Sequence, residues 1–108
     1  MFYEFRTYTA APGKIFALSD RFRDGTVGLF EAHGFTLVGF WQPTVGRSFD
    51  QLHYLLKWDS SEQMQECWNA MLADPKWAAL VQESEKDGPL IARIDNELWA
   101  ATEYSPAV

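Results

Sequence analysis

Three polar side chains alternate along the first strand-like segment of the chain, residues 3–8 (YEFRTY). Glu4, Arg6 and Tyr8 are spaced two apart, so an extended backbone places them on one side. His53 lies in a later strand-like segment, residues 51–58 (QLHYLLKW), which we expect to pair beside the first. Side chains on one face of paired strands come within reach of each other. A carboxylate beside an imidazole fixes its tautomer, so His53, Arg6 and Glu4 are candidate catalytic residues for proton transfer.

The same residues also have a purely structural interpretation. Buried charges have to be paired, so Glu4 and Arg6 would then pair inside the protein or with a partner subunit. Such a pair would set the register between the two surfaces that meet there. Ion pairs that serve only the structure also contain groups with shifted pKa values, as active sites do. Such structural pairs are more common than catalytic ones.

Aromatic side chains indicate a second candidate site. Apolar pockets with a few polar groups are ordinary ligand sites, although the same aromatics can simply fill a core. We expect a flat pocket between helices and sheet, with Tyr8, Trp41, Phe22 and Trp68 as ligand contacts. The further aromatics of this group are Phe40 and Trp77.

His33 ends the first predicted helix and directly precedes Gly34. A cap at the helix end explains this histidine, and contact with a ligand is the alternative. His33 and His53 are the only histidines, and a non-haem iron site needs two histidines and a carboxylate that converge. Nothing in the sequence brings them together, so we predict no metal site and no cofactor. Cys67 is interpreted as a small buried hydrophobic residue.

The elements that must position these residues alternate in type. We expect strands at 2–9, 35–42, 51–58 and 90–102, a helix at 14–33, a helix capped by Asp59 or Ser60, and a short helix from Pro75. The order β-α-β-β-α-β predicts one ferredoxin-like α+β domain over residues 1–108. Right-handed crossovers then put the helices on one face of a four-stranded antiparallel sheet, with the first and third strands in its centre.

The two faces of this sheet differ less in polarity than the two faces of a sheet in a monomeric domain should. We assign the more apolar rows to the helix side, namely Tyr3, Phe5 and Thr7 with Leu52, Tyr54, Leu56 and Trp58. The row of Glu4, Arg6 and Tyr8 would then share the other face with His53 and Leu55. That face is too apolar to meet water, so we expect a second copy of the sheet to cover it. The prediction is a homodimeric α/β barrel.

Composition excludes several classes of function. The chain has 108 residues and a net charge of −6, from nine Lys and Arg against fifteen Asp and Glu. No basic stripe is visible, so nucleic acids and anionic membrane surfaces are not expected partners. A single cysteine fits a reducing compartment, and the first residues resemble neither a signal nor a transit peptide. We expect a cytoplasmic protein without a membrane span.

Several short motifs together resemble the NIPSNAP family. They are the strand YEFRTY, the turn APGK, the helix end EAHG leading into LVGFW, the strand LHYLLKW and the restart ADPKW, which follow one another in this order. The resemblance covers nearly the whole chain and implies the homodimeric barrel. It supplies no mechanism. The wider superfamily includes haem proteins, haem-degrading and cofactor-free monooxygenases and small isomerases, so haem binding is a lesser alternative.

Three functions remain open from the sequence. The first is a homodimer that binds a small hydrophobic molecule in the cleft between sheet and helices. The second is a cofactor-independent monooxygenase or isomerase in which His53, Arg6 and Glu4 act on that molecule. The third is a non-enzymatic interaction module whose polar row only fixes subunit pairing. Whether the protein is an enzyme depends on where His53 and Arg6 point.

Overall fold

The computed structural model describes residues 1–106. Its elements are β1 (Phe2–Ala10), α1 (Ile15–Arg21), the π-helical turn η1 (Phe22–Thr26), α2 (Val27–Ala32), β2 (Thr36–Trp41), β3 (Gln51–Trp58), α3 (Ser61–Ala73), α4 (Pro75–Ser84) and β4 (Ile91–Trp99). Because α1, η1 and α2 form one continuous helical segment and α3 and α4 follow each other, the order is βαββαβ. The predicted ferredoxin-like α+β fold is confirmed.

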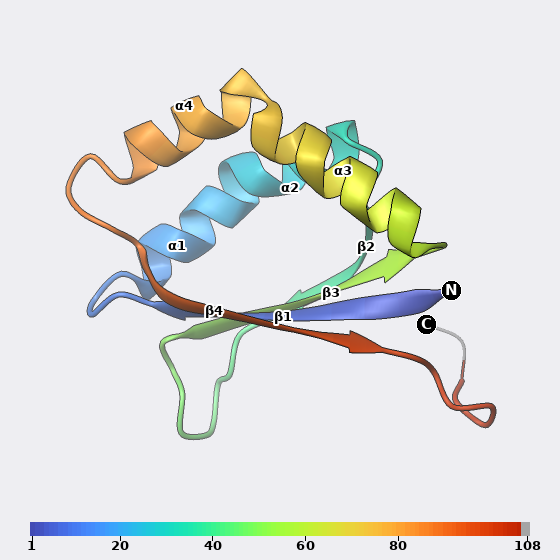
Figure 1. Cartoon of the computed structure of the whole chain (residues 1–108). Coiled ribbons are helices and arrows are strands. Elements are labelled where there is room, and N and C mark those ends of the chain that lie inside the picture. The colour runs from blue at the N-terminus through green and yellow to red at the C-terminus, as the bar shows by residue number, and fades with distance from the viewer. Residues whose placement is uncertain (107–108) are drawn as a thin grey trace.

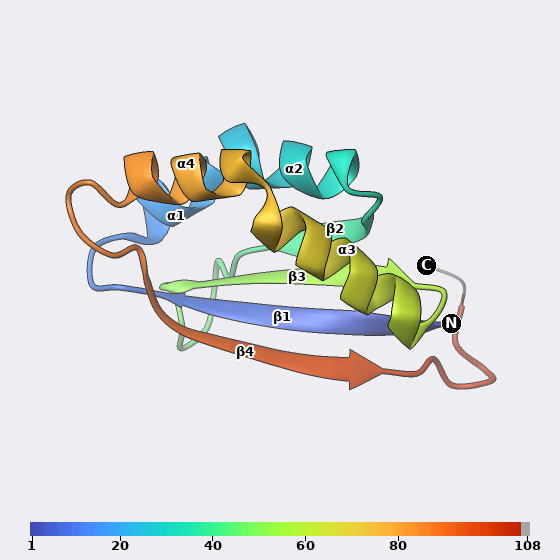
Figure 2. The same ribbon diagram turned by 45° about the horizontal axis from the view of Figure 1, so that its top comes forward.

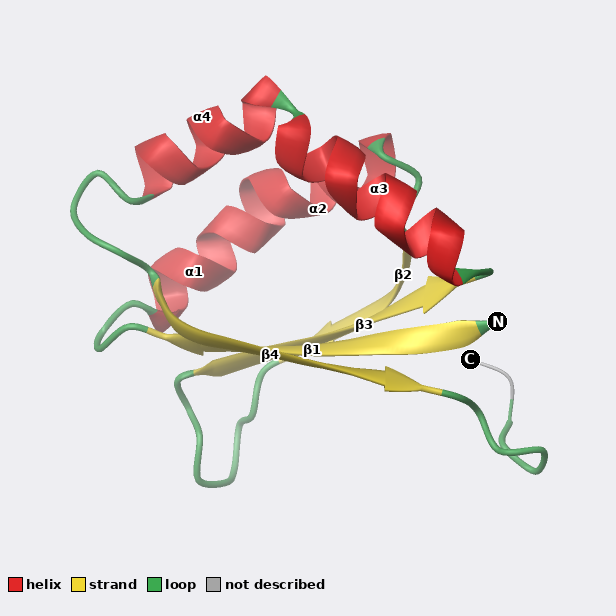
Figure 3. Ribbon diagram, viewed as in Figure 1, coloured by secondary structure: helices red, strands yellow, loops and turns green. Residues whose placement is uncertain are grey.

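The four strands form one antiparallel sheet in the order β2-β3-β1-β4. As predicted, the first and third strands are its centre. All helices lie on one face of the sheet (Figures 1 and 3). No helix of residues 1–106 is long and apolar enough to cross a membrane.

The helix expected over residues 14–33 contains a π-helical turn in its middle. Gly25 lies in this turn, and a Cβ atom there would come within 2.7 Å of the Leu80 side chain of α4. The glycine therefore permits close packing between the two helical segments. At the end of α2, Gly34 has a φ of +80°, which is the left-handed conformation expected of it.

Side-chain caps define the second pair of helices. Ser60 caps α3 by accepting a hydrogen bond from the Gln63 backbone, and the Gln63 side chain accepts one from the Asp59 N–H in return. Asp74 ends α3 and caps α4 by accepting a hydrogen bond from the Lys76 N–H. The break between the helices therefore follows from Asp74 and Pro75, and the new helix begins at Pro75, where the sequence predicted it.

The faces of β1 are opposite to our expectation. Glu4 and Tyr8 are buried beneath the helices, and Arg6 lies between them in the same row. Registers pair Arg6 with Tyr54 and Glu4 with Leu56, so this row shares its face with the buried row of β3. The prediction that the polar row faces away from the helices is wrong. Its charges are tolerated beneath the helices because they find partners there, and hydropathy alone does not reveal such partners.

The opposite face, which we call the open face, has no helix of the described residues on it. Its side chains include Tyr3, Phe5, Thr7, His53, Leu55, Trp41 and Trp99. The Phe5 ring stacks on Trp99 with centroids 4.4 Å apart and on His53 with centroids 5.6 Å apart. The open face therefore carries an aromatic row across three strands.

Candidate functional site

A cavity of about 560 Å³ lies between the sheet and the helices. The strands β1 and β4 contribute a connected polar group to its lining, and the helical segments contribute most of its apolar side chains together with several polar ones. The lining residues are Glu4, Arg6, Tyr8, Thr26, Phe30, Ser61, Met64, Gln65, Trp68, Asn69, Met71, Leu72, Trp77, Ile94 and Asn96. Figure 2 shows α3 crossing above the sheet beside the edge strand β4. The volume is ordinary for a small-molecule site.

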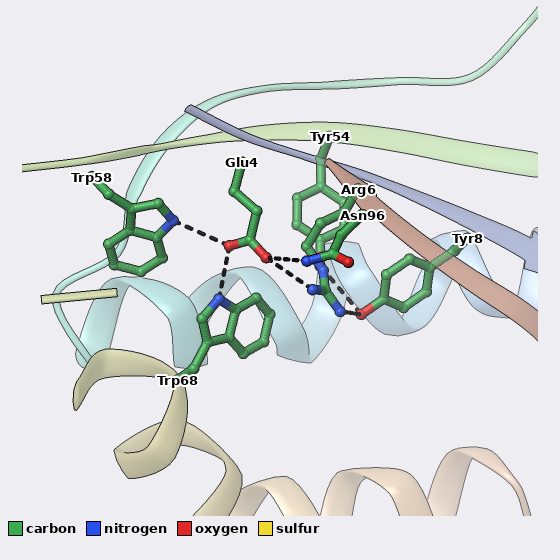
Figure 4. Close-up of polar contacts among 7 residues, drawn as sticks. All are labelled: Glu4, Arg6, Tyr8, Tyr54, Trp58, Trp68 and Asn96. Carbon is green, nitrogen blue, oxygen red and sulfur yellow. Dashed lines mark hydrogen bonds and ion pairs between the residues drawn. The ribbon is translucent and has the colours of Figure 1, made fainter. Parts of the chain in front are cut away.

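Glu4 forms the centre of the polar side of this cavity (Figure 4). Its Oε1 accepts hydrogen bonds from the indole N–H groups of Trp58 at 3.1 Å and Trp68 at 2.8 Å. Its Oε2 accepts from Arg6 Nη1 at 3.0 Å and from the Asn96 amide at 3.2 Å. These four donors fill the lone-pair sites of the carboxylate. Glu4 is therefore fixed in place by β1, β3, α3 and β4 at once.

Arg6 is held by the same network. Its Nε donates to the Tyr54 hydroxyl at 2.9 Å and its Nη2 to the Tyr8 hydroxyl at 3.2 Å. Its guanidinium also lies 4.4 Å from the centre of the Trp68 ring, a cation–π contact. Burial alone would lower the pKa of Arg6, but the two tyrosine oxygens and Glu4 raise it above its ordinary value. The side chain is a fixed cation on the cavity wall.

Two tyrosine hydroxyls share this network and leave one proton unassigned. Tyr54 donates to Tyr8 at 3.2 Å, and both oxygens accept from Arg6. Two hydroxyl protons and one mutual hydrogen bond leave one proton without an acceptor among the described residues. Tyr54 is fully buried and uses its own proton in the bond to Tyr8, whereas Tyr8 lines the cavity. The remaining proton therefore belongs to Tyr8, at the cavity surface.

Four of the candidate residues lie together, although the polar row was expected on the other face of the sheet. Glu4, Arg6, Tyr8 and Trp68 all line the cavity. They come from β1 and α3, which are more than fifty residues apart in the chain. Their functional roles stay predictions, but their proximity does not.

Two other candidates lie on the open face. His53 contacts Thr7, with His53 Nδ1 and Thr7 Oγ1 3.0 Å apart, and the sheet separates it from Glu4 and Arg6. Trp41 pairs with His53 across the strands and is 52% exposed. The expected contact of His53 with Glu4 or Arg6 is wrong because β1 presents its other face to the cavity.

Phe22 and His33 also lie outside the cavity lining. Phe22 is buried in the core, where its ring meets Tyr8 edge-on at 5.2 Å. His33 ends α2, and its Nε2 lies 2.8 Å from Asp74 Oδ2. This contact lowers the pKa of Asp74, and the Lys76 N–H adds to that effect. His33 therefore links the end of α2 to the cap of α4.

Sequence reasoning missed the partners that fix Glu4, chiefly Trp58 and Asn96. Alternation in the third strand placed Trp58 on the helix side correctly, but nothing in the sequence connects an indole N–H with a carboxylate 54 residues away. Asn96 lies opposite Arg6 in the β1–β4 register. Its proximity to Glu4 can therefore be expected only once the pairing of these two strands is known.

The described residues contain no cluster of three or more His, Cys, Asp or Glu side chains that could hold a metal ion. Cys67 is partly buried on α3, and burial raises the pKa of its thiol, with nearby Glu66 adding to the effect. A raised pKa reduces the thiolate fraction, so neither metal binding nor thiol chemistry finds support at this thiol.

Comparison with known proteins places the chain in a structural context. The sequence model of the NIPSNAP family matches residues 3–106. A NIPSNAP family protein of unknown function from Agrobacterium tumefaciens has 26% sequence identity, with a TM-score of 0.85 over 98% of this chain and 92% of that one. An uncharacterised NIPSNAP-like domain protein from Burkholderia xenovorans has 20% identity and a TM-score of 0.85 over 99% and 90%.

A more distant structure is described as a putative antibiotic biosynthesis monooxygenase from Nitrosomonas europaea. It has 9% identity and a TM-score of 0.64 over 94% of this chain and 98% of that one. At this identity the likeness concerns the fold alone. No curated protein matches the sequence.

Proposed function

Because this chain belongs to the NIPSNAP family, whose structures share its fold, we propose that it binds a small, mainly apolar molecule in the cavity between sheet and helices. The observation that carries the proposal is the cavity of about 560 Å³, in which most of the apolar lining comes from the helices and the charged lining is the fixed Glu4–Arg6 pair. We further propose that the binding unit is a homodimer formed through the open face.

The walls of the cavity favour an apolar ligand. Phe30 and Met71 are buried lining residues, and Trp68 meets the Phe30 ring edge-on with centroids 5.6 Å apart. Leu72 is 54% exposed and Ile94 is 47% exposed. Both line the cavity, so apolar surface remains available to a ligand at its rim. Covering such surface is favourable by about 25 cal/mol per Å².

Acid–base catalysis has little support in this arrangement. Glu4 is the only carboxylate among the described lining residues, and four hydrogen bonds occupy it. His53 lies across the sheet and His33 is bonded to Asp74. An isomerase needs a base within reach of the substrate proton. The geometry therefore supports binding better than the isomerase alternative.

The dimer proposal rests on the open face. Phe5, His53 and Trp99 form a stacked aromatic row there, and Trp99 remains 43% exposed in the single chain. Trp41 adds further exposed aromatic surface on β2. Exposed aromatic surface of this kind is typical of an interface core. A second copy would cover the same residues on both chains by two-fold symmetry.

Titration with 2-ethylnaphthalene tests the binding proposal, with tryptophan fluorescence as the readout because Trp68 and Trp77 line the cavity. We expect saturable binding that Ile94→Trp weakens about tenfold, since an indole at this position takes up space in the cavity mouth.

Leu98→Trp is the matched control. Leu98 lies in the same row of β4 and is similarly exposed, but it is not a lining residue. Its replacement should leave the affinity unchanged. A wild-type protein that shows no saturable binding, or equal effects of the two variants, would contradict a site in this cavity.

A further inference from the structure

Resting on the proposed ligand binding, we propose that the cavity selects an uncharged apolar molecule that carries a ketone-type carbonyl oxygen, received by the Tyr8 hydroxyl beside Arg6. The chemical class follows from what the polar side of the cavity still offers after its internal hydrogen bonds are made (Figure 4).

Tyr8 and Arg6 keep hydrogen-bond donors that are available to a ligand. The Tyr8 hydroxyl oxygen accepts from Arg6 and from Tyr54, so its own proton is available to the cavity. Arg6 has five N–H groups, of which three are used, one each toward Tyr54, Glu4 and Tyr8. Two N–H groups therefore lack a partner among the described residues. This corner of the cavity offers donors next to one another.

The same corner of the cavity has few free hydrogen-bond acceptors. All four lone-pair sites of the Glu4 carboxylate are occupied by Trp58, Trp68, Arg6 and Asn96. Among the side chains of this network, the Asn96 amide oxygen is the one acceptor that makes no hydrogen bond to a described residue, because Asn96 donates to Glu4 only through its N–H group. It stands against three available donors, the Tyr8 hydroxyl and two Arg6 N–H groups. Since an unsatisfied buried donor is costly, a carbonyl oxygen, which accepts from these donors and adds none, suits the corner better than an alcohol.

The cavity lining carries no net charge. Arg6 and Glu4 are the only charged residues among the described lining residues, and they form an ion pair at 3.0 Å. Their charges cancel, and the lining offers no second cation. A carboxylate ligand would thus enter this cavity without a free counter-charge, which costs more than placing a neutral acceptor there. The cavity should discriminate against anions of the same shape.

Three naphthalenes of similar size test the proposed preference for a neutral ligand with a carbonyl group. They are 2-acetylnaphthalene with a carbonyl group, 2-ethylnaphthalene without one and the anion 2-naphthoate. We expect the ketone to bind about three- to tenfold more tightly than the hydrocarbon, the range for one net hydrogen bond, and 2-naphthoate to bind most weakly. The carbonyl stretching frequency of the bound ketone should fall below its value in hexane, because a donor polarises the bond.

Tyr8→Phe removes the donor and keeps the ring. This variant should lose the preference for the ketone and the shift in stretching frequency, while its affinity for 2-ethylnaphthalene stays within about twofold. That retained affinity also shows that the variant is folded. Tyr3→Phe makes the same change two strand positions from Phe5 on the open face and should keep both the preference and the shift.

The outcomes separate the two proposals. Saturable binding of the ketone and the hydrocarbon with equal affinity overturns the carbonyl assignment and leaves the cavity as a binding site. A ketone preference that persists in Tyr8→Phe, or tighter binding of 2-naphthoate than of the ketone, also overturns it. No binding of any of the three probes overturns the proposed function and the carbonyl assignment with it.

Discussion

Glu4 is 2% exposed, and its burial as a charged residue depends on its four donors. Two of them are indole N–H groups, which have no other polar role to perform. A buried charge is tolerated when it is paired and its remaining lone pairs are satisfied. The residue therefore organises one side of the cavity without being available to a ligand.

Glu4→Gln should destabilise the protein by about 3 kcal/mol. The amide turns one acceptor into a donor that faces other donors, and Arg6 loses its counter-charge in a partly buried position. Urea denaturation followed by far-UV circular dichroism measures the free energy of unfolding.

Glu83→Gln is the control, because Glu83 is also paired with a cation, Lys86, but this pair is exposed. Its effect should stay within about 0.5 kcal/mol. Equal losses in the two variants would show that burial of the Glu4 network contributes nothing.

The residue types in this network were readable from the sequence, but the partners were not. The spacing of Glu4, Arg6 and Tyr8 predicted one shared face, and they share it. Pairing of Glu4 with Arg6 was one of the two interpretations that the sequence left open. The bonds from Trp68 and Asn96 span 64 and 92 residues, and their existence depends on tertiary packing that no local pattern encodes.

At the scale of elements, the π-helical turn η1 brings the long helical segment against α4. Thr26 at its end is buried and lines the cavity, so the turn contributes directly to the site. Gly25 lies one residue earlier, where an added Cβ would meet the end of the Leu80 side chain at 2.7 Å. π-turns within helices frequently occur at functional sites, and here the turn reaches the proposed one.

Two glycines of this segment should respond differently to replacement by alanine. Gly28→Ala should stabilise the protein by up to about 1 kcal/mol, because nothing lies within 4 Å of the new Cβ and alanine favours the helix. Gly25→Ala should be about 1 to 2 kcal/mol less favourable than Gly28→Ala, since its Cβ meets Leu80. Thermal or urea unfolding measures both.

The Leu80→Ala background identifies the cause. Removing the Leu80 methyl groups should abolish most of the difference between the two glycine variants, which a double-mutant cycle expresses as a coupling energy. A difference that persists in this background would place the strain in the backbone of the turn instead.

Element types and order were predictable, whereas the orientation of β1 was not. Strand β3 alternates strongly, so its buried row of Leu52, Tyr54, Leu56 and Trp58 was assigned correctly. In β1 both rows carry aromatic residues, and the row with more charge is the buried one. Hydrophobic alternation decides a face only when one row is clearly more apolar, and charges that pair with each other remove that contrast.

At the scale of the whole molecule, one sheet serves two surfaces. The helix-side face carries the cavity, and the open face carries the aromatic row proposed as the dimer interface. The proposed site and the proposed interface therefore share strands but not side chains. Changes on one face can be tested with little direct effect on the other.

The dimer prediction is tested on the open face. Light scattering after gel filtration should give twice the 12.4 kDa of one chain for the wild type. Leu55→Arg should shift the protein toward the single-chain mass, because it places an unpaired charge in the proposed interface core. Binding of 2-ethylnaphthalene should persist in this variant.

Val45→Arg makes a similar change on the exposed loop between β2 and β3 and should keep the wild-type mass. A wild-type protein with the mass of one chain at all concentrations would contradict the dimer. So would a Leu55→Arg variant that keeps the wild-type mass.

The alternation of β1 has a consequence for which insertions the gene can tolerate. Successive side chains of this strand point to opposite faces of the sheet. One residue inserted between Tyr3 and Tyr8 would therefore move every later side chain of the strand to the other face. An insertion directly after Tyr3 would turn the Phe5 ring toward the cavity, and the Glu4 carboxylate and the Arg6 guanidinium toward the open face. Length variation among relatives should therefore concentrate in the segment from Pro43 to Asp50, outside the strands.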